Sequence, residues 1–246
     1  MMVSTSSRSP RIFIADADFQ SGKKINLSGD QAHYLRSVMR LAEGSSVRLF
    51  NGVQGDWLSV IKEANKKNVI LEISQQISEQ KNSPDVDVVV SVLKKEAFDL
   101  CVEKASELGV QRFQPVICDH TVVHKINVER AQRIATEAAK QCERQDVMQV
   151  LPVTSLKNIL NSWNKERKLM CCLERVEALP IRQSLDHLAG HPVSVLIGPE
   201  GGFSEAEKAA IAGLPFALPV NLGSRILRSE TALMASLACV MISKEN

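Results

Sequence analysis

The chain has 246 residues and a mass of 27.1 kDa, with 44% hydrophobic and 24% charged residues. These fractions exclude collagen-like, disordered and disulfide-scaffold proteins. A formal net charge of +2 and an aromatic content of only 4% also exclude attachment to nucleic acid or membrane by bulk charge or by rows of stacked aromatic rings. Any nucleic-acid contact must therefore come from a local basic patch.

The cysteines and the hydropathy pattern indicate where the protein works. The six cysteines include no CxxC pair, and most stand in apolar runs, as buried free thiols of a reducing compartment do. The opening residues MMVSTSSRSPRIFI lack the apolar core of a signal peptide, and no run of about 18 apolar residues could span a bilayer. We therefore expect a cytoplasmic protein without a membrane segment.

The first part of the chain, to about Gln80, predicts one short helix and three strands. Residues 30–41 carry apolar side chains at helical spacing, with Asp30 as the cap. Strand-like runs follow at Val47–Phe50, Trp57–Ile61 and Val69–Ile73. Short strands at this spacing favour a small β-barrel or a curled sheet.

Polar residues 78–85 form the predicted linker, after which strands alternate with helices. We expect strands at 86–93, 113–117, 169–173, 193–197 and 217–222, and helices at 95–108, 128–141, 155–163, 181–188, 204–214 and 231–242. Ser204 and Glu207 predict a capping box, and Ser229 or Thr231 the cap of the last helix. This alternation implies a parallel sheet covered on both faces, and hence domains at 1–80 and 81–246. The last helix is apolar almost all round, so we expect it to be buried, in part against a second subunit.

Two segments near the C-terminus follow strands, where open α/β sheets bind ligands. Leu196–Ser204 (LIGPEGGFS) has three glycines and a proline, so its backbone can approach a ligand closely, although Pro-x-Gly-Gly is also an ordinary turn. It has neither the dinucleotide fingerprint nor the P-loop ending, which disfavours a phosphate-bearing cofactor. Asn221–Thr231 (NLGSRILRSET) contains Arg225 and Arg228, which suit recognition of carbonyls, carboxylates or phosphates. A solvated arginine turn paired with Glu230 is the alternative for this second segment.

Metal chemistry is not predicted. Cys118-x-His120 and His120-x3-His124 lie beyond a strand, but no second Cys or His pair at zinc spacing accompanies them. The sequence also contains no GxSxG motif and no evident nucleophile beside a base.

Several segments in collinear order carry a family resemblance. They are LIGPEGGFSEAE from Leu196, LGSRILRSETALMASLA from Leu222, PRIFI from Pro10, HYLRSVMRL from His33 and KASELGVQRFQPV from Lys104. Together they resemble the RsmE family of 16S ribosomal RNA (uridine-1498-N3) methyltransferases, in the SPOUT or trefoil-knotted superfamily. The chain departs from the family pattern around Lys140, Glu143 and Met148, which leaves the shape of that loop open.

The resemblance implies a fold and a function. An N-terminal PUA-like β-barrel would help to dock RNA, and a C-terminal α/β knot with a parallel sheet would hold S-adenosylmethionine. The enzyme would work as a homodimer on 16S rRNA of the small ribosomal subunit, without a metal.

The resemblance also implies the site residues. The cofactor would be bound by Ile197, Gly198, Pro199, Glu200, Gly201, Gly202, Leu222, Gly223, Ser224, Ile226 and Leu227. Arg228, with Arg225 as second choice, would stabilise the charge that spreads onto uridine O2 and O4 as N3 loses its proton. Glu230 would act as the base or orient an arginine. RNA phosphates would contact Arg11, Arg36, Arg40 and Arg144.

Three other functions stay open on the sequence alone. A non-catalytic RNA-binding or ribosome-assembly factor would have the fold without binding the cofactor. A methyltransferase of the same superfamily could act on transfer RNA or on a ribose hydroxyl. A small-molecule α/β enzyme would need a closed apolar pocket and no basic surface.

Overall fold

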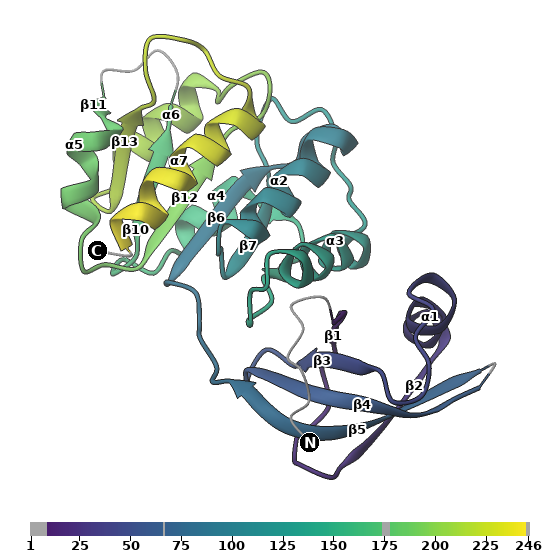
Figure 1. Cartoon of the computed structure of the whole chain (residues 1–246). Helices are drawn as coiled ribbons and strands as arrows, with labels where there is room; N and C mark the ends of the chain where they lie inside the picture. Colours follow the sequence, from purple (N-terminus) through teal and green to yellow (C-terminus); the bar gives the residue numbers. More distant parts are fainter. Residues whose placement is uncertain (1–8, 66, 174–177, 245–246) are drawn as a thin grey trace. The chain divides into compact units, whose positions relative to one another are not determined.

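A computed structural model describes residues 9–65, 67–173 and 178–244 (Figure 1). The chain divides into two compact units, one reaching to Asn82 and the other beginning at Ser83. The sequence places the boundary after residue 80.

The described residues of the N-terminal unit form a five-stranded sheet in the order β1-β3-β4-β5-β2. Its strands are β1 (Arg11–Phe13), β2 (Lys24–Ser28), β3 (Ser46–Phe50), β4 (Asp56–Ala64) and β5 (Asn68–Ser78). The three predicted strands are confirmed as β3, β4 and β5. Register shifts between β4 and β5 bend the sheet around a core that includes Leu35, Leu49 and Leu71. The sequence missed β1 and β2 because β1 has three residues and β2 is mostly exposed, so neither shows a clear alternation.

The predicted helix 30–41 is shorter than expected and begins earlier. It consists of α1 (Gly29–His33) and a π-helix, η1 (Tyr34–Val38). The N-cap is Ser28 rather than Asp30, which lies in the first turn, where a carboxylate is favourable to the helix dipole. The chain leaves the helical conformation at Arg40, which has a φ of 53°.

The described residues of the C-terminal unit form a parallel sheet in the order β11-β13-β10-β12-β6-β7-β8, with β9 beside β7. The strands are β6 (Val86–Ser91), β7 (Arg112–Ile117), β8 (Gln149–Val150), β9 (Thr154–Ser155), β10 (Lys168–Cys172), β11 (Leu179–Pro180), β12 (Val193–Ile197) and β13 (Ala217–Asn221). All five predicted strands are confirmed. Their pairing is parallel, which is also as predicted. β8, β9 and β11 have two residues each, too few to show a periodicity.

The predicted helices of this unit are also confirmed. They are α2 (Lys95–Glu107), α3 (Val128–Gln141), α4 (Leu156–Asn161), α5 (Ile181–Ser184) with the 3-10 helix η2 (Leu185–Leu188), α6 (Glu205–Ala212) and α7 (Ser229–Lys244). None of the helices in the described part of the chain is long and apolar enough to cross a membrane.

Helices cover both faces of the parallel sheet. Val88 and Val90 of β6 belong to the core formed with α2, α3 and α7, whereas Val89 between them belongs to the core formed with α4 and α6. α2 and α7 lie side by side on the first face (Figure 1). The apolar character of α7 is explained by burial of Leu233 and Leu237, but Ile242 near its end is 64% exposed.

The six cysteines are free thiols, but only three of them are buried, and Cys172 and Cys239 are half-buried. Cys101, Cys118 and Cys171 are buried, whereas Cys142 is exposed just after α3. It follows the last helical residue, where the chain turns outward.

Candidate functional site

Two loops at one edge of the parallel sheet enclose a cavity. They are loop 1 (residues 198–203, after β12) and loop 2 (residues 222–228, after β13). β12 and β13 both pair with β10, one on each side, so their carboxyl ends meet at the same edge. The cavity has a volume of about 560 Å³, within the range of about 300–1,000 Å³ of small-molecule sites.

The cavity brings together every residue that the sequence assigns to cofactor binding. It is lined by Ile197, Gly198, Pro199, Glu200, Gly201 and Gly202 on one side, and by Leu222, Gly223, Ser224, Arg225, Ile226 and Leu227 on the other. Loop 1 is a tight turn, with Gly202 N–H donating to Pro199 O at 2.9 Å, and it is a cavity wall as well. The two interpretations left open by its sequence therefore do not exclude each other.

Loop 1 needs its glycines for different reasons. A Cβ on Gly198 would lie 2.7 Å from the ring of Phe203, which is buried and cannot move aside easily. Gly202 has a φ of 70°, in the left-handed region that other residues avoid, with open space around its Cα. Packing against Phe203 thus requires glycine at position 198, whereas the backbone conformation requires glycine at position 202.

Ser229 links the two loops. It is the first residue of α7, and its hydroxyl donates to the carbonyl oxygen of Gly198 at 2.9 Å. The expectation that Ser229 or Thr231 caps α7 is wrong, because both residues lie inside the first turn of the helix. The capping box of α6 is confirmed, since Ser204 accepts from Glu207 N–H and Glu207 accepts from Ser204 N–H.

Some lining residues were not predicted, among them Cys172, Phe203 and Lys208. Cys172 ends β10, between the two strands that carry the loops, and desolvation raises the pKa of its thiol to about 12. Lys208 is on α6 one turn after Ser204 and pairs with Glu205 at 2.8 Å. Only the strand order, which places β10 between β12 and β13, could have indicated Cys172.

The predicted catalytic residues occupy different positions around the cavity. Arg225 is exposed and lines the cavity. Arg228 is exposed and is not a lining residue, although its neighbours in sequence, Leu227 and Ser229, are. Glu230 is half-buried on the first turn of α7.

Two carboxylates act on α2, one of them at its start. Glu200 of loop 1 accepts a long hydrogen bond of 3.4 Å from the backbone N–H of Lys94. Desolvation, together with the charges of Glu230 and Glu200, raises the pKa of the Cys101 thiol to about 12. Glu200 of loop 1 and Glu230 of α7 therefore both act on α2.

The arginines assigned to RNA in the N-terminal unit differ in exposure. Arg36 is half-buried and Arg40 exposed, and Arg36 shares a surface hollow with His33 and Lys67. Arg11 has a side chain only 3% exposed, pairs with Asp56 at 2.8 Å and stacks on the Phe50 ring. This placement corrects the assignment of Arg11, because a guanidinium used inside the sheet cannot reach a phosphate at the surface.

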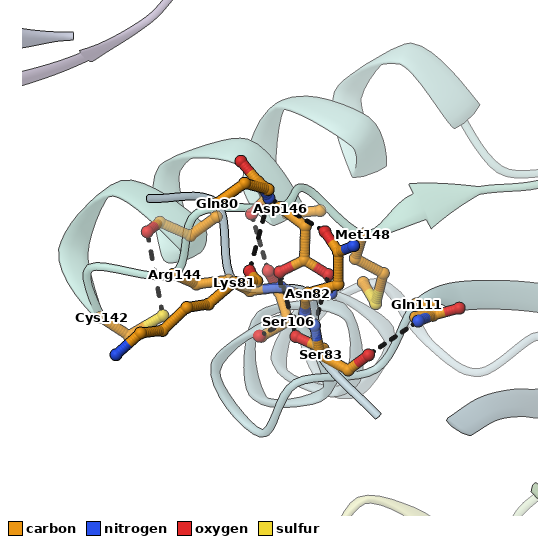
Figure 2. Close-up of polar contacts among 12 residues, drawn as sticks. Gln80, Lys81, Asn82, Ser83, Ser106, Gln111, Cys142, Arg144, Asp146 and Met148 are labelled. Carbon is orange, nitrogen blue, oxygen red and sulfur yellow. Dashed lines mark hydrogen bonds and ion pairs between the residues drawn. The ribbon is translucent and has the colours of Figure 1, made fainter. Parts of the chain in front are cut away.

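Arg144 needs the same correction (Figure 2). Its side chain is 6% exposed and forms a bidentate pair with Asp146, at 2.7 and 3.0 Å, while its third nitrogen donates to Ser106 O at 2.9 Å. Asp146 in turn accepts from the hydroxyl and the backbone N–H of Ser83. Arg144 therefore ties the chain after α3 to the beginning of the unit instead of facing RNA.

His120 and Cys118 have structural partners. His120 Nδ1 lies 3.1 Å from the carbonyl oxygen of Gly202, and Cys118 is buried. Within the part of the chain that the structure describes, no group of three or more His, Cys, Asp or Glu side chains is arranged to hold a metal.

Comparison with known proteins assigns the family. Residues 80–241 match the RNA methyltransferase domain family, and residues 27–74 match the RNA methyltransferase PUA domain family. The ribosomal RNA small subunit methyltransferase E of Synechocystis is 30% identical over 220 residues, covering 87% of this chain and 71% of that protein. This chain belongs to the ribosomal RNA small subunit methyltransferase E family.

Other members of this methyltransferase E family are similar along their whole length. The one from Rickettsia conorii is 28% identical and covers 94% of this chain and 95% of its own. A crystal structure of the Neisseria gonorrhoeae member, bound to S-adenosyl methionine, has a TM-score of 0.83 at 27% identity and covers 94% of this chain and 96% of its own. The family and the fold predicted from the sequence are thereby confirmed: a C-terminal SPOUT (trefoil-knot) domain with a parallel sheet, and a small PUA-like N-terminal domain.

Proposed function

We propose that this protein transfers a methyl group from S-adenosylmethionine to N3 of a uridine in 16S rRNA, the uridine numbered 1498. The observation that carries the proposal is the cavity between loops 1 and 2, which gathers the two glycine-containing segments at neighbouring strand ends. Membership of the methyltransferase E family supports the reaction class and the substrate class.

The cavity fits S-adenosylmethionine in shape and in charge. Gly198, Gly201 and Gly202 line it with backbone that carries no side chain, and Leu222, Ile226 and Leu227 offer an apolar surface for an adenine ring. The lining also includes one acidic residue, Glu200, and two basic residues, Lys208 and Arg225. Side chains of both charges are needed, because S-adenosylmethionine carries a sulfonium, an ammonium and a carboxylate. When bound, it supplies a methyl group on a positively charged sulfur.

Three residues of the second loop and α7 would then act on the uridine. N3 becomes a nucleophile only when it loses its proton, and negative charge then spreads onto O2 and O4. Arg228, which is exposed between two lining residues in the sequence, is our assignment for the group that stabilises this charge, with Arg225 on the wall as the second choice. Glu230 either accepts the N3 proton or orients Arg228.

The N-terminal unit would dock the RNA. Arg36, Lys67 and His33 line one surface hollow, and Arg40 is exposed nearby in the chain. Basic groups at such a surface contact phosphates and position the RNA without reading its sequence. We therefore propose residues 1–80 as the RNA-docking domain and 81–246 as the methyltransferase domain.

We also propose a cytoplasmic homodimer that takes part in ribosome biogenesis. The free cysteines suit a reducing compartment, and the exposed Ile242 near the end of α7 suits contact with a second copy.

The test is methylation of RNA that lacks the modification. Purified protein is incubated with radiolabelled S-adenosylmethionine and either naked 16S rRNA or assembled small subunits from a strain deleted for the gene. A methyl group on N3 blocks base pairing, so primer extension should stop at uridine 1498, and mass spectrometry should find 3-methyluridine. Label in transfer RNA or on a ribose hydroxyl would overturn the assignment of the substrate. Binding of rRNA without binding of S-adenosylmethionine would instead indicate a non-catalytic assembly factor.

A further inference from the structure

A hydrogen-bonded turn contacts loop 1 without lining the cavity. It is formed by Cys118–Thr121, directly after β7. Cys118 N–H donates to the Thr121 hydroxyl at 2.8 Å, and Thr121 N–H donates to Cys118 O at 3.1 Å. The Thr121 hydroxyl also lies 2.9 Å from that of Ser91, the last residue of β6, and both side chains are buried. The turn is therefore fixed to the ends of two adjacent core strands.

Asp119 connects this turn to the start of α6. Its backbone N–H donates to the Glu207 carboxylate at 2.9 Å, and its own carboxylate accepts from the Ser204 hydroxyl at 2.5 Å. Ser204 and Glu207 are the two members of the capping box that follows loop 1. The end of loop 1 is thus held by the same turn.

His120 reaches the glycines in the middle of loop 1. Its Nδ1 lies 3.1 Å from Gly202 O, and a Cβ on Gly201 would lie 3.2 Å from its own Cβ, so the two chains touch closely. A carbonyl oxygen can only accept, so Nδ1 must carry a proton in this contact. Neither His120 nor Asp119 lines the cavity, so any effect on a ligand must pass through loop 1.

We propose that His120 is a positioning residue for the cofactor cavity. The Nδ1–H of His120 holds the carbonyl of Gly202 outward, and this fixes the orientation of the peptide group between Gly202 and Phe203. Glycine reaches both signs of φ at little cost, so without this bond the peptide could turn over and reverse the donor and acceptor that it presents. This inference rests on the proposed function, in which the cavity binds S-adenosylmethionine.

Three substitutions separate the donor from the bulk of the side chain. In His120→Asn the amide nitrogen can take the place of Nδ1, in His120→Gln it extends to the place of Nε2, and His120→Ala has no donor. We expect His120→Ala and His120→Gln to weaken S-adenosylmethionine binding about fivefold by calorimetry, the loss of one hydrogen bond, and His120→Asn to stay within about twofold of wild type. The kcat at saturating cofactor should change little, because His120 touches no reacting atom.

The outcomes distinguish the inference from the proposed function. Equal losses in the Asn and Ala variants, or no loss in any variant, would overturn the role of His120. Failure of the wild-type protein to bind S-adenosylmethionine would overturn the proposed function instead. A nitrogen-15 NMR spectrum of the wild-type protein at pH 8 gives a second test that needs no variant: a protonated Nδ1 on His120 is expected, and the opposite tautomer would overturn the inference.

Discussion

The hydroxyl of Ser229 lies 2.9 Å from the carbonyl oxygen of Gly198 and donates a hydrogen bond to it. The bond joins the first residue of α7 to the first residue of loop 1, across 31 positions of sequence. Loop 2 must therefore end where loop 1 begins. This relationship closes the cavity on one side and makes its shape depend on both loops together.

Removal of this bond should weaken cofactor binding. We expect Ser229→Ala to raise the Kd for S-adenosylmethionine about fivefold, because a half-buried acceptor on the cavity wall loses its partner. Ser243→Ala is the matched control, since Ser243 makes the same kind of bond to Val240 O at the far end of α7. Calorimetry on both variants decides the matter, and equal Kd values would show that the link does not shape the cavity.

Gly198 should tolerate no side chain. In Gly198→Ala the new Cβ would press on the buried Phe203 ring at 2.7 Å, so the loop must move, and we expect at least a tenfold loss of cofactor affinity (about 1.4 kcal/mol). Gly213→Ala should be silent, because Gly213 ends α6 with ordinary helical dihedrals and its Cβ would make only ordinary contacts, 3.6 Å from the carbonyl oxygens of Ala209 and Ala210. Wild-type affinity in Gly198→Ala would mean that loop 1 is not part of the binding site.

Arg228 should affect the rate more than binding. If its guanidinium stabilises charge on O2 and O4, Arg228→Ala should lower kcat about 100-fold while leaving the Kd for S-adenosylmethionine unchanged. Arg225→Ala, on the cavity wall, should instead raise that Kd. Single-turnover methylation with both substrates saturating separates the two effects. Full rate in Arg228→Ala, with the loss found in Arg225→Ala, would transfer the catalytic role to Arg225.

Charge reversal on the N-terminal unit should weaken RNA binding. We expect the double variant Arg36→Glu, Arg40→Glu to bind 16S rRNA more weakly and with a shallower dependence on salt, because fewer phosphates are neutralised. Lys165→Glu serves as the control, since this exposed lysine precedes β10, at the sheet edge opposite the cavity. Filter-binding titrations at several salt concentrations measure the slope. An unchanged slope would remove both arginines from the interface.

Arg144 should support stability. Arg144→Met leaves the half-enclosed Asp146 carboxylate without its guanidinium, and we expect a loss of about 3 kcal/mol in the free energy of unfolding at pH 7. Arg130→Met, which breaks the more exposed pair with Asp99, should cost less than about 1 kcal/mol. Urea denaturation measures the free energy of unfolding of both variants. A similar loss of stability in the two would contradict a buried role for Arg144.

The same pair predicts a pH dependence. Burial would raise the pKa of Asp146, but Arg144 and the two Ser83 donors outweigh burial, and the pKa lies below its ordinary value. A depressed carboxyl pKa stabilises the fold above the unfolded value of about 4, and this contribution is lost as the pH falls through the folded pKa. The difference between wild type and Arg144→Met should therefore shrink below about pH 4. A difference that stays constant to pH 2.5 would contradict this account.

The sequence by itself determined the class of fold and the segments that matter. Strands such as 193–197 and helices such as 128–141 were predicted to the residue, because burial on both sides of a parallel sheet requires continuous apolar runs and because helix faces repeat. Both loops were identified from the same local signals, since glycines, prolines and arginines at strand ends are visible without a structure. Family motifs then supplied the reaction that no periodicity could indicate.

Only the tertiary structure decided which side chains meet. Arg11 and Arg144 look like Arg36 and Arg40 in the sequence, yet the first two are used in internal ion pairs. Ser229 was expected to cap a helix and is bonded to Gly198 instead, while Cys172 and His120 approach the two loops from strands or turns far away in the chain. The physical reason is that exposure and hydrogen-bond partners depend on distances between segments, which the order of strands in the sheet sets and the local sequence does not encode.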